Sequence, residues 1–109
     1  MKRLLFVLIL LAAWPAQAQM TDNSATVGTS ASTVLAAATN RSFILLYNRS
    51  SNTIYCSWTA TAVANAAGTF GLVGLGANLL ITKPQVIPGN ALSCIASGAS
   101  SGLTALTIP

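Results

Sequence analysis

The chain has 109 residues, of which 53% are hydrophobic and 6% charged, and its formal net charge is +4. This composition excludes a disordered chain, because disorder requires low hydrophobicity and high net charge. The chain has no histidine and a single acidic residue, Asp22, which excludes carboxylate pairs, catalytic triads and the usual zinc ligand sets. We therefore expect no enzyme, with no catalytic residue, no cofactor-binding residue and no metal site.

The N-terminal segment has the order of a secretory signal peptide. Two cations near the start precede ten apolar residues (4–13), and Ala-Gln-Ala follows at 16–18, with small residues where a signal peptidase reads the chain. This order predicts a signal peptide over residues 1–18, cleaved between Ala18 and Gln19. The apolar run is shorter than the about 20 residues of a membrane span, so we expect no stable membrane anchor after cleavage.

Residues 19–30 are polar and show no sustained period, which predicts a flexible N-terminal arm before a folded domain of residues 31–109. Residues 33–36 are the first candidate strand. Residues 42–48 form a continuous apolar run that is typical of a strand buried on both faces, although periodicity alone does not separate it from a short helix.

The clearest alternation lies in residues 53–59. Ile54, Cys56 and Trp58 share one parity, and Tyr55 and Ser57 share the other. Because side chains of a strand alternate between its two faces, the first three are expected in the core, and Tyr55 and Ser57 are expected to face outward.

The middle of the chain is less regular. Residues 60–67 are rich in alanine and suit either a helical turn or a loose loop. Residues 68–76 contain four glycines, which favours bulges, bends or a mobile loop over a regular element. Residues 78–82 are a further short apolar strand.

The last third of the chain again alternates. Residues 85–87 lie between two prolines, so they are expected to form an edge strand or an extended crossing, because proline cannot donate within a ladder. Leu92, Cys94 and Ala96 share one parity, and residues 103–108 form the last strand. The whole pattern predicts an all-β fold, a small antiparallel β-sandwich of jelly-roll or immunoglobulin-like type with about seven to eight short strands.

Cys56 and Cys94 are the only cysteines of the chain. Both share the parity of large apolar neighbours, so both are expected to point into the core. An exported chain meets an oxidising compartment, where such a pair is usually bonded. We therefore predict a Cys56–Cys94 disulfide, the alternative being two buried free thiols.

The order of three segments resembles small β-sandwich domains of tailed-phage virion proteins. These segments are Thr-Ser-Ala-Ser-Thr-Val-Leu-Ala-Ala at 29–37, Asn-Arg-Ser-Phe-Ile-Leu-Leu-Tyr-Asn at 40–48 and Ile-Tyr at 54–55, and residues 79–97 continue the likeness. The resemblance covers most of residues 27–108. It implies a head-fibre or decoration role on a particle surface and brings no catalytic residues. The predicted signal peptide and the cysteine pair are not part of that pattern.

Two functions remain open on this basis. The first is an exported structural or surface protein, phage-virion-like, that self-associates or decorates a larger particle; its location would be periplasmic, extracellular or virion-associated. The second is a secreted monomeric binding module, adhesin-like or a small inhibitor, that uses loops 48–52, 60–77 and 97–102. A nucleic-acid partner is not expected, because the cations beyond residue 18 are Arg41, Arg49 and Lys83, and they do not cluster.

Overall fold

The computed structural model describes residues 19–109. The predicted signal peptide, with Ala18 of its cleavage site, lies outside these residues. The described part of the chain contains nine strands and no helix, which confirms the all-β class. The strands are β1 Thr21–Asp22, β2 Ala25–Val27, β3 Ser32–Leu35, β4 Phe43–Asn48, β5 Ile54–Ser57, β6 Thr69–Leu72, β7 Asn78–Thr82, β8 Leu92–Ala96 and β9 Ser101–Ile108. Within residues 19–109, no helix is long and apolar enough to cross a membrane.

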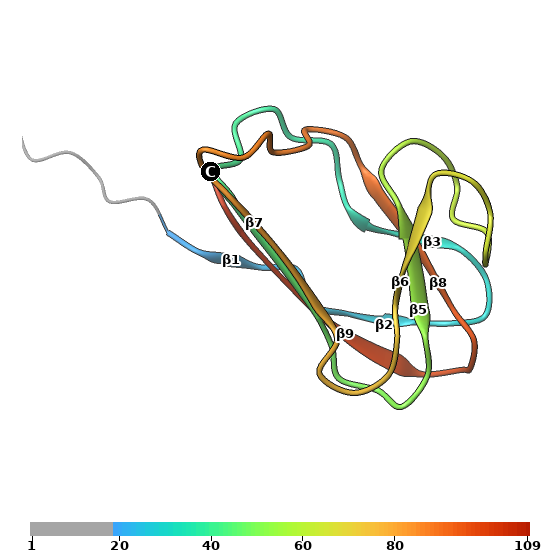
Figure 1. Cartoon of the computed structure of the whole chain (residues 1–109). Coiled ribbons are helices and arrows are strands. Elements are labelled where there is room, and N and C mark those ends of the chain that lie inside the picture. The colour runs from blue at the N-terminus through green and yellow to red at the C-terminus, as the bar shows by residue number, and fades with distance from the viewer. Residues whose placement is uncertain (1–18) are drawn as a thin grey trace, which may run out of the picture.

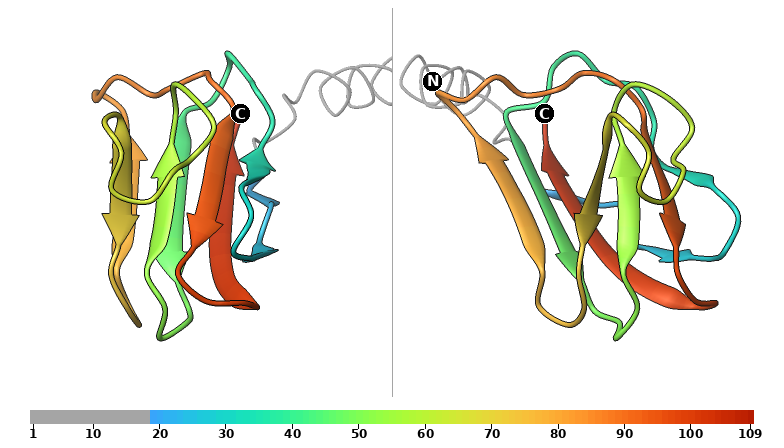
Figure 2. Two further views of the ribbon diagram at one scale, coloured as in Figure 1. Left: turned by 90° about the vertical axis from the view of Figure 1, so that its right-hand side faces the viewer. Right: turned by 45° about the vertical axis from the view of Figure 1, so that its right-hand side comes forward.

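The strands form two antiparallel sheets that face each other as a β-sandwich (Figure 1). Sheet A has the order β1-β9-β4-β7, and β2 also pairs with β9; sheet B has the order β3-β8-β5-β6. Figure 2 shows that β6 and β7 lie at one lateral side of the sandwich and that β1, β2 and β3 lie at the other. Each sheet therefore ends in an edge strand on both sides.

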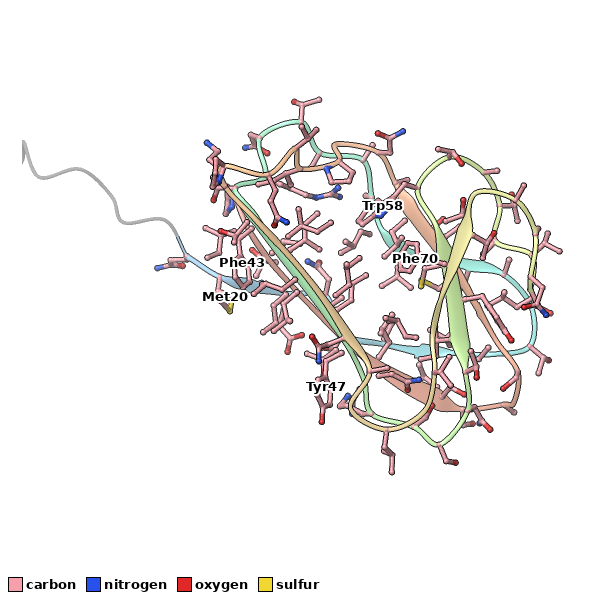
Figure 3. All side chains as sticks on the ribbon, in the orientation of Figure 1. Met20, Phe43, Tyr47, Trp58 and Phe70 are labelled. Carbon is pink, nitrogen blue, oxygen red and sulfur yellow. A yellow bond between two sulfur atoms is a disulfide. The ribbon has the colours of Figure 1, made fainter. Side chains whose placement is uncertain are left out.

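The core follows from strict alternation along the strands. In β9 every second side chain is buried, and the same holds for β8. Because the side-chain period of a strand is two, each strand contributes one face to the space between the sheets. The fully buried large apolar side chains of the core are Val27, Ile44, Leu46, Ile54, Leu92 and Leu103. Trp58 and Phe70 are half-buried and pack against this core, as Figure 3 shows.

The structure differs from the sequence-based expectation of an arm over residues 19–30. Two segments of it, β1 and β2, pair with β9, and the Asn23 N–H between them donates to the Ala105 carbonyl at 2.7 Å. Val27 is completely buried. In β2 the apolar Ala25 and Val27 flank the exposed Thr26, whereas both residues of β1 are polar and exposed. The alternation is therefore too short to show a period of two in the sequence.

The glycine-rich segment 68–76 is also more regular than expected. Its first part is β6, paired with β5 in the register Cys56↔Phe70. Gly71 lies opposite Tyr55, and a β-carbon on Gly71 would come within 3.5 Å of the Tyr55 ring. Gly71 therefore lies beside the Tyr55 ring within a regular strand, in a place that a β-carbon would occupy at ordinary van der Waals distance. Gly74 and Gly76 have φ values of +72° and +85° and shape the turn into β7.

Two smaller expectations are resolved as well. Of the two alternatives for residues 85–87, the edge strand is wrong: the residues form no strand and lie in the segment that crosses from β7 of sheet A to β8 of sheet B. The Gln85 N–H donates to the Thr82 carbonyl and the Gln85 Oε1 accepts from the Thr82 N–H, at 3.0 and 3.1 Å. Ser57, expected to face outward, is buried. Its hydroxyl accepts from the N–H groups of Thr59 and Ala60 at 3.3 Å, which satisfies a tight bend at the end of β5.

Candidate assembly surface

The two cysteines lie on the central strands of sheet B. Cys56 of β5 and Cys94 of β8 are direct cross-strand partners and form a disulfide bond, with their Cα atoms 4.1 Å apart. Both residues are fully buried. The bond is shielded from solvent and crosslinks the two central strands of sheet B.

The loops expected to bind a ligand do not form one surface. Loops 48–52 and 97–102 lie at the same end, where the Asn52 Nδ2 donates to the Ser101 Oγ at 3.0 Å and the Arg49 N–H donates to the Gly102 carbonyl at 2.9 Å. Of the third segment, 60–77, residues 60–68 lie at the opposite end of the sandwich (Figure 1), but residues 73–77 lie beside loop 48–52, where the Gly76 N–H donates to the Asn48 carbonyl at 3.0 Å. Residues 48–52, 73–77 and 97–102 thus share one end of the sandwich, and residues 60–68 lie apart from it.

Asn48 holds the first of these ends in place and is completely buried. Its Nδ2 donates to the carbonyls of Asn52 and Leu72 at 2.7 and 2.8 Å, and its Oδ1 accepts from the N–H and hydroxyl of Ser50 at 2.8 Å each. All four hydrogen-bonding positions of the side-chain amide are thereby used. The residue ties the β4–β5 loop to the end of β6.

A recess of about 250 Å³ lies beside the segment that follows β3 and the C-terminal end of β9. Arg41 lines it and is 9% exposed. Its Nη1 donates to the carbonyls of Pro88 and Asn90 at 3.0 and 2.9 Å, and its Nη2 donates to the Ala36 carbonyl. Burial lowers the pKa of Arg41 from its usual value.

Arg41 therefore acts as a clamp between its own loop, which joins β3 to β4, and the loop that joins β7 to β8. Within residues 19–109 no buried side-chain nitrogen or oxygen lacks a hydrogen-bond partner, so the recess holds no orphaned polar group for a ligand to satisfy. In the same part of the chain, no three residues of metal-binding type lie together.

The outer face of sheet A differs from an ordinary solvent-facing sheet surface. Leu45 of β4 lies between Leu80 of β7 and Leu106 of β9 in the same cross-strand row, and Phe43 lies opposite Ile108. Side chains of one cross-strand row lie within contact distance of each other. We name this surface the outer apolar face; its residues are Phe43, Leu45, Tyr47, Leu80, Leu106 and Ile108.

The outer apolar face is open to solvent. Leu80 and Tyr47 are 48% and 41% exposed, and Phe43, Leu45 and the two β9 residues are half-buried. Figure 3 shows Phe43 and Tyr47 pointing away from the core, and Met20 lies on the same side. Antiparallel sheets with one solvated face normally carry polar residues there. On this face Thr82, Asn78 and Thr104 lie opposite Phe43 and Tyr47, but the central row is entirely apolar in β4, β7 and β9.

Two opposite charges lie at the border of this face. Asp22 is the β1 partner of Leu106, and the Arg49 guanidinium lies next to Gly102. Hydrogen bonds from Ser24, together with the nearby positive charge of Arg49, lower the pKa of Asp22 below its usual value. The Ser24 N–H donates to the Asp22 Oδ1 at 2.9 Å.

The sequence contained the signal for this face, in the continuous apolar run at 42–48. That run predicts burial on both faces of β4, but in the described chain only one face is covered. The inner residues Ile44 and Leu46 are completely buried, whereas Tyr47 on the outer face is exposed. The part of the prediction that fails is the burial of the outer face.

No protein-family model matches the chain, and no curated protein matches its sequence. Among solved structures, the chain is similar to a Bacillus endospore appendage protein, one of a family described as disulfide-linked pili. The sequence identity is 14%, the match covers 88% of this chain and 91% of the appendage protein, and the TM-score is 0.46.

Proposed function

We propose that this chain is an exported, non-enzymatic structural protein that assembles with copies of itself into a larger surface structure. The outer apolar face of sheet A is the contact through which copies associate. The Cys56–Cys94 disulfide holds each subunit in shape.

One observation carries the proposal: β4 is apolar on both faces, while the described chain covers only one of them. Strands with apolar residues on both faces are typical of sheets with a layer on each side. A contiguous apolar patch on a folded domain marks an interaction site. The missing layer is therefore supplied by another molecule, and a second copy presents the same apolar chemistry.

Two further features support this reading. A chain with 6% charged residues has little electrostatic repulsion between copies, and low charge promotes association. The buried disulfide suits an oxidising compartment outside the cytoplasm, in agreement with the predicted signal peptide at 1–18.

The more specific part of the proposal concerns a virion. The likeness of residues 27–108 to tailed-phage virion domains suggests a head-fibre or decoration role, in which the subunit decorates a particle. Its test is genomic: we expect the gene to lie among tail or capsid genes. A gene placed among unrelated cellular export genes would contradict the virion role and leave self-assembly standing.

The alternative, a monomeric binding module, has less support. Residues 60–68 of its proposed loops lie at the end of the sandwich opposite to the others (Figure 1). The recess at Arg41 is not lined by these loops, and the Arg41 guanidinium that lines it already donates to the carbonyls of Ala36, Pro88 and Asn90.

Two tyrosines provide a matched test of the outer apolar face. Tyr47 lies on the outer surface of sheet A, and Tyr55 lies on the outer surface of sheet B beside Gly71. The full chain, exported and processed by its host, is expected to form oligomers in light scattering. Tyr47→Asp is expected to shift the protein to monomers, because a charge in an apolar contact must be desolvated, whereas Tyr55→Asp is expected to leave the oligomers unchanged.

Circular dichroism confirms that each variant is folded before its mass is compared. A protein that stays monomeric at every concentration tested would refute self-assembly. An equal effect of both substitutions would refute the assignment of the contact to sheet A.

A further inference from the structure

We infer that two copies of this chain join edge to edge through β7, so that their two A sheets become one continuous antiparallel sheet. This inference rests on the proposed self-assembly and names the strand, the register and the symmetry of one contact. It uses backbone groups at the edge of β7, whereas the first contact uses outward side chains of sheet A; Leu80 contributes its backbone to the one and its side chain to the other.

β7 has backbone N–H and C=O groups that form no hydrogen bond within sheet A. The Asn48 N–H donates to the Ala77 carbonyl, and the register continues through Leu46↔Leu79 and Ile44↔Ile81. Since hydrogen-bonded residues alternate along an antiparallel strand, the backbone N–H and C=O groups of residues 77, 79 and 81 point toward β4. The N–H and C=O groups of Asn78 and Leu80 therefore face the open edge.

The open edge of β7 ends before Thr82. Thr82 has the same parity as Leu80, but its N–H and C=O groups are both hydrogen-bonded to Gln85. The backbone groups available for pairing in β7 are therefore those of Asn78 and Leu80.

The opposite edge of sheet A is partly protected by its own side chains. There the Ser24 N–H, which would otherwise face outward between β1 and β2, is bonded to the Asp22 carboxylate at 2.9 Å. Asp22 also places a charge on that edge, and charged side chains are a common way to protect an edge strand. By contrast, no residue from Asn78 to Thr82 is charged or a proline. β7 is therefore the more open of the two edges.

Exposed apolar side chains concentrate around β7. Val73 and Leu75, in the turn before it, are 74% and 72% exposed; Leu80 is 48% exposed; and Val86, just after it, is 93% exposed. In a two-fold antiparallel pair, the segment before β7 in one copy lies beside the segment after β7 in the other. The exposed residues at the two ends of the strand would then meet each other.

One pairing register between two β7 strands uses all the free backbone groups of Asn78 and Leu80. When Asn78 of one copy lies opposite Leu80 of the second copy, two-fold symmetry produces four backbone hydrogen bonds, and the bonds of Thr82 to Gln85 stay in place. In this register, Lys83 of one copy and Lys83 of the other are about 27 Å apart along the strands. That separation exceeds the Debye length of about 10 Å in moderate salt, so the two charges do not oppose pairing.

The same register places Leu79 directly opposite Leu79 of the second copy, in a non-hydrogen-bonded pair. Leu79 is half-buried and packs against the core, so pairing covers apolar surface that the single chain leaves partly open. The native Cys56–Cys94 pair has this cross-strand geometry, with Cα atoms 4.1 Å apart. A cysteine at position 79 in each copy would therefore be able to form a disulfide across the two-fold axis.

Amide hydrogen exchange tests the backbone contact on the unaltered protein. The amides of Asn78 and Leu80 are expected to exchange at least about tenfold more slowly in concentrated, associated protein than in dilute protein. The Thr82 amide, already bonded within its own chain, is the internal control and is expected to change little. Fast exchange at Asn78 and Leu80 in protein that is associated would overturn the inference.

Substitutions test the register. Leu79→Cys is expected to give a covalent dimer under mild oxidation. Leu80→Pro removes an N–H that faces the open edge and leaves the β4–β7 ladder intact, so it is expected to abolish this dimer contact, whereas Leu80→Val keeps the N–H and is expected to retain it. Circular dichroism checks that Leu80→Pro is folded. If it is not, amide exchange still tests the contact, because that experiment uses the unaltered protein.

The outcomes separate the two proposals. A monomeric native protein would refute both the proposed function and the β7 contact. Oligomers that persist in Leu80→Pro, dissociate in Tyr47→Asp and yield no Leu79→Cys dimer would refute the β7 contact alone.

Discussion

Cys56 and Cys94 lie directly opposite each other on β5 and β8, and their disulfide closes a loop between positions 38 residues apart in the chain. A crosslink over a loop of this length reduces the entropy of the unfolded chain and stabilises the fold by about 4 kcal/mol. A small domain depends on such a contribution, because it buries a modest share of its surface.

The double variant Cys56→Ala, Cys94→Ala is accordingly expected to lose about 4 kcal/mol of unfolding free energy, measured by denaturant titration. Native protein with its disulfide reduced provides the comparison and is expected to lose a similar amount. A loss below about 1 kcal/mol would show that the bond contributes little.

Asn48 is expected to be among the most sensitive polar residues of the fold. Asn48→Ala removes two donors from buried carbonyls and an acceptor from Ser50, which is expected to cost about 3 kcal/mol of unfolding free energy. Asn48→Asp is expected to cost more, because a carboxylate would face the carbonyl oxygens of Asn52 and Leu72. The exposed Asn40 is the control, and Asn40→Ala is expected to change the unfolding free energy by less than about 0.5 kcal/mol.

Arg41 clamps loops that come from distant parts of the chain. Arg41→Lys cannot donate to the carbonyls of Ala36, Pro88 and Asn90 at once, because lysine lacks the fixed fork of the guanidinium. We expect a loss of about 2 kcal/mol of unfolding free energy and faster amide exchange in residues 36–41 and 89–91. Arg49→Lys, at an exposed position, is expected to have no measurable effect; equal effects of the two substitutions would contradict the clamp.

The stability of the fold is expected to depend weakly on pH. Asp22 is the only acidic side chain and the chain has no histidine. Because hydrogen bonds from Ser24 lower its folded-state pKa, Asp22 stabilises the fold above its unfolded pKa of about 4, and this contribution is lost as pH falls through the lowered folded value.

The midpoint of thermal unfolding should therefore stay constant between about pH 5 and 8 and decline slightly below about pH 4. In Asp22→Asn the acid decline is expected to disappear. A steep loss of stability between pH 5 and 8 would point to a titrating group that this account does not include.

The local pattern of residues determined much of the fold. The alternation in 54–58 and 92–96 places Cys56 and Cys94 on the inner side of their strands, where the structure buries both. These predictions succeed because alternation between the faces of a strand is a local property, readable within five or six residues.

Pairing between distant strands was decided by the tertiary structure alone. Residues 21–27 become strands because β9, some 80 positions later, offers them partners, and residues 69–72 become a strand because β5 pairs with them. Whether such a segment becomes a strand depends on which other segment lies beside it in the fold. The local sequence of a polar or glycine-rich stretch gives little indication of that pairing.

The run from Phe43 to Tyr47 shows both sides of this division. Its composition alone determines that both faces of the strand favour burial. Only the arrangement of the two sheets decides that Ile44 and Leu46 are covered by sheet B while Leu45 and Tyr47 face outward. The physical reason is that one chain of this length builds two layers, and a strand that is apolar on both faces needs a third.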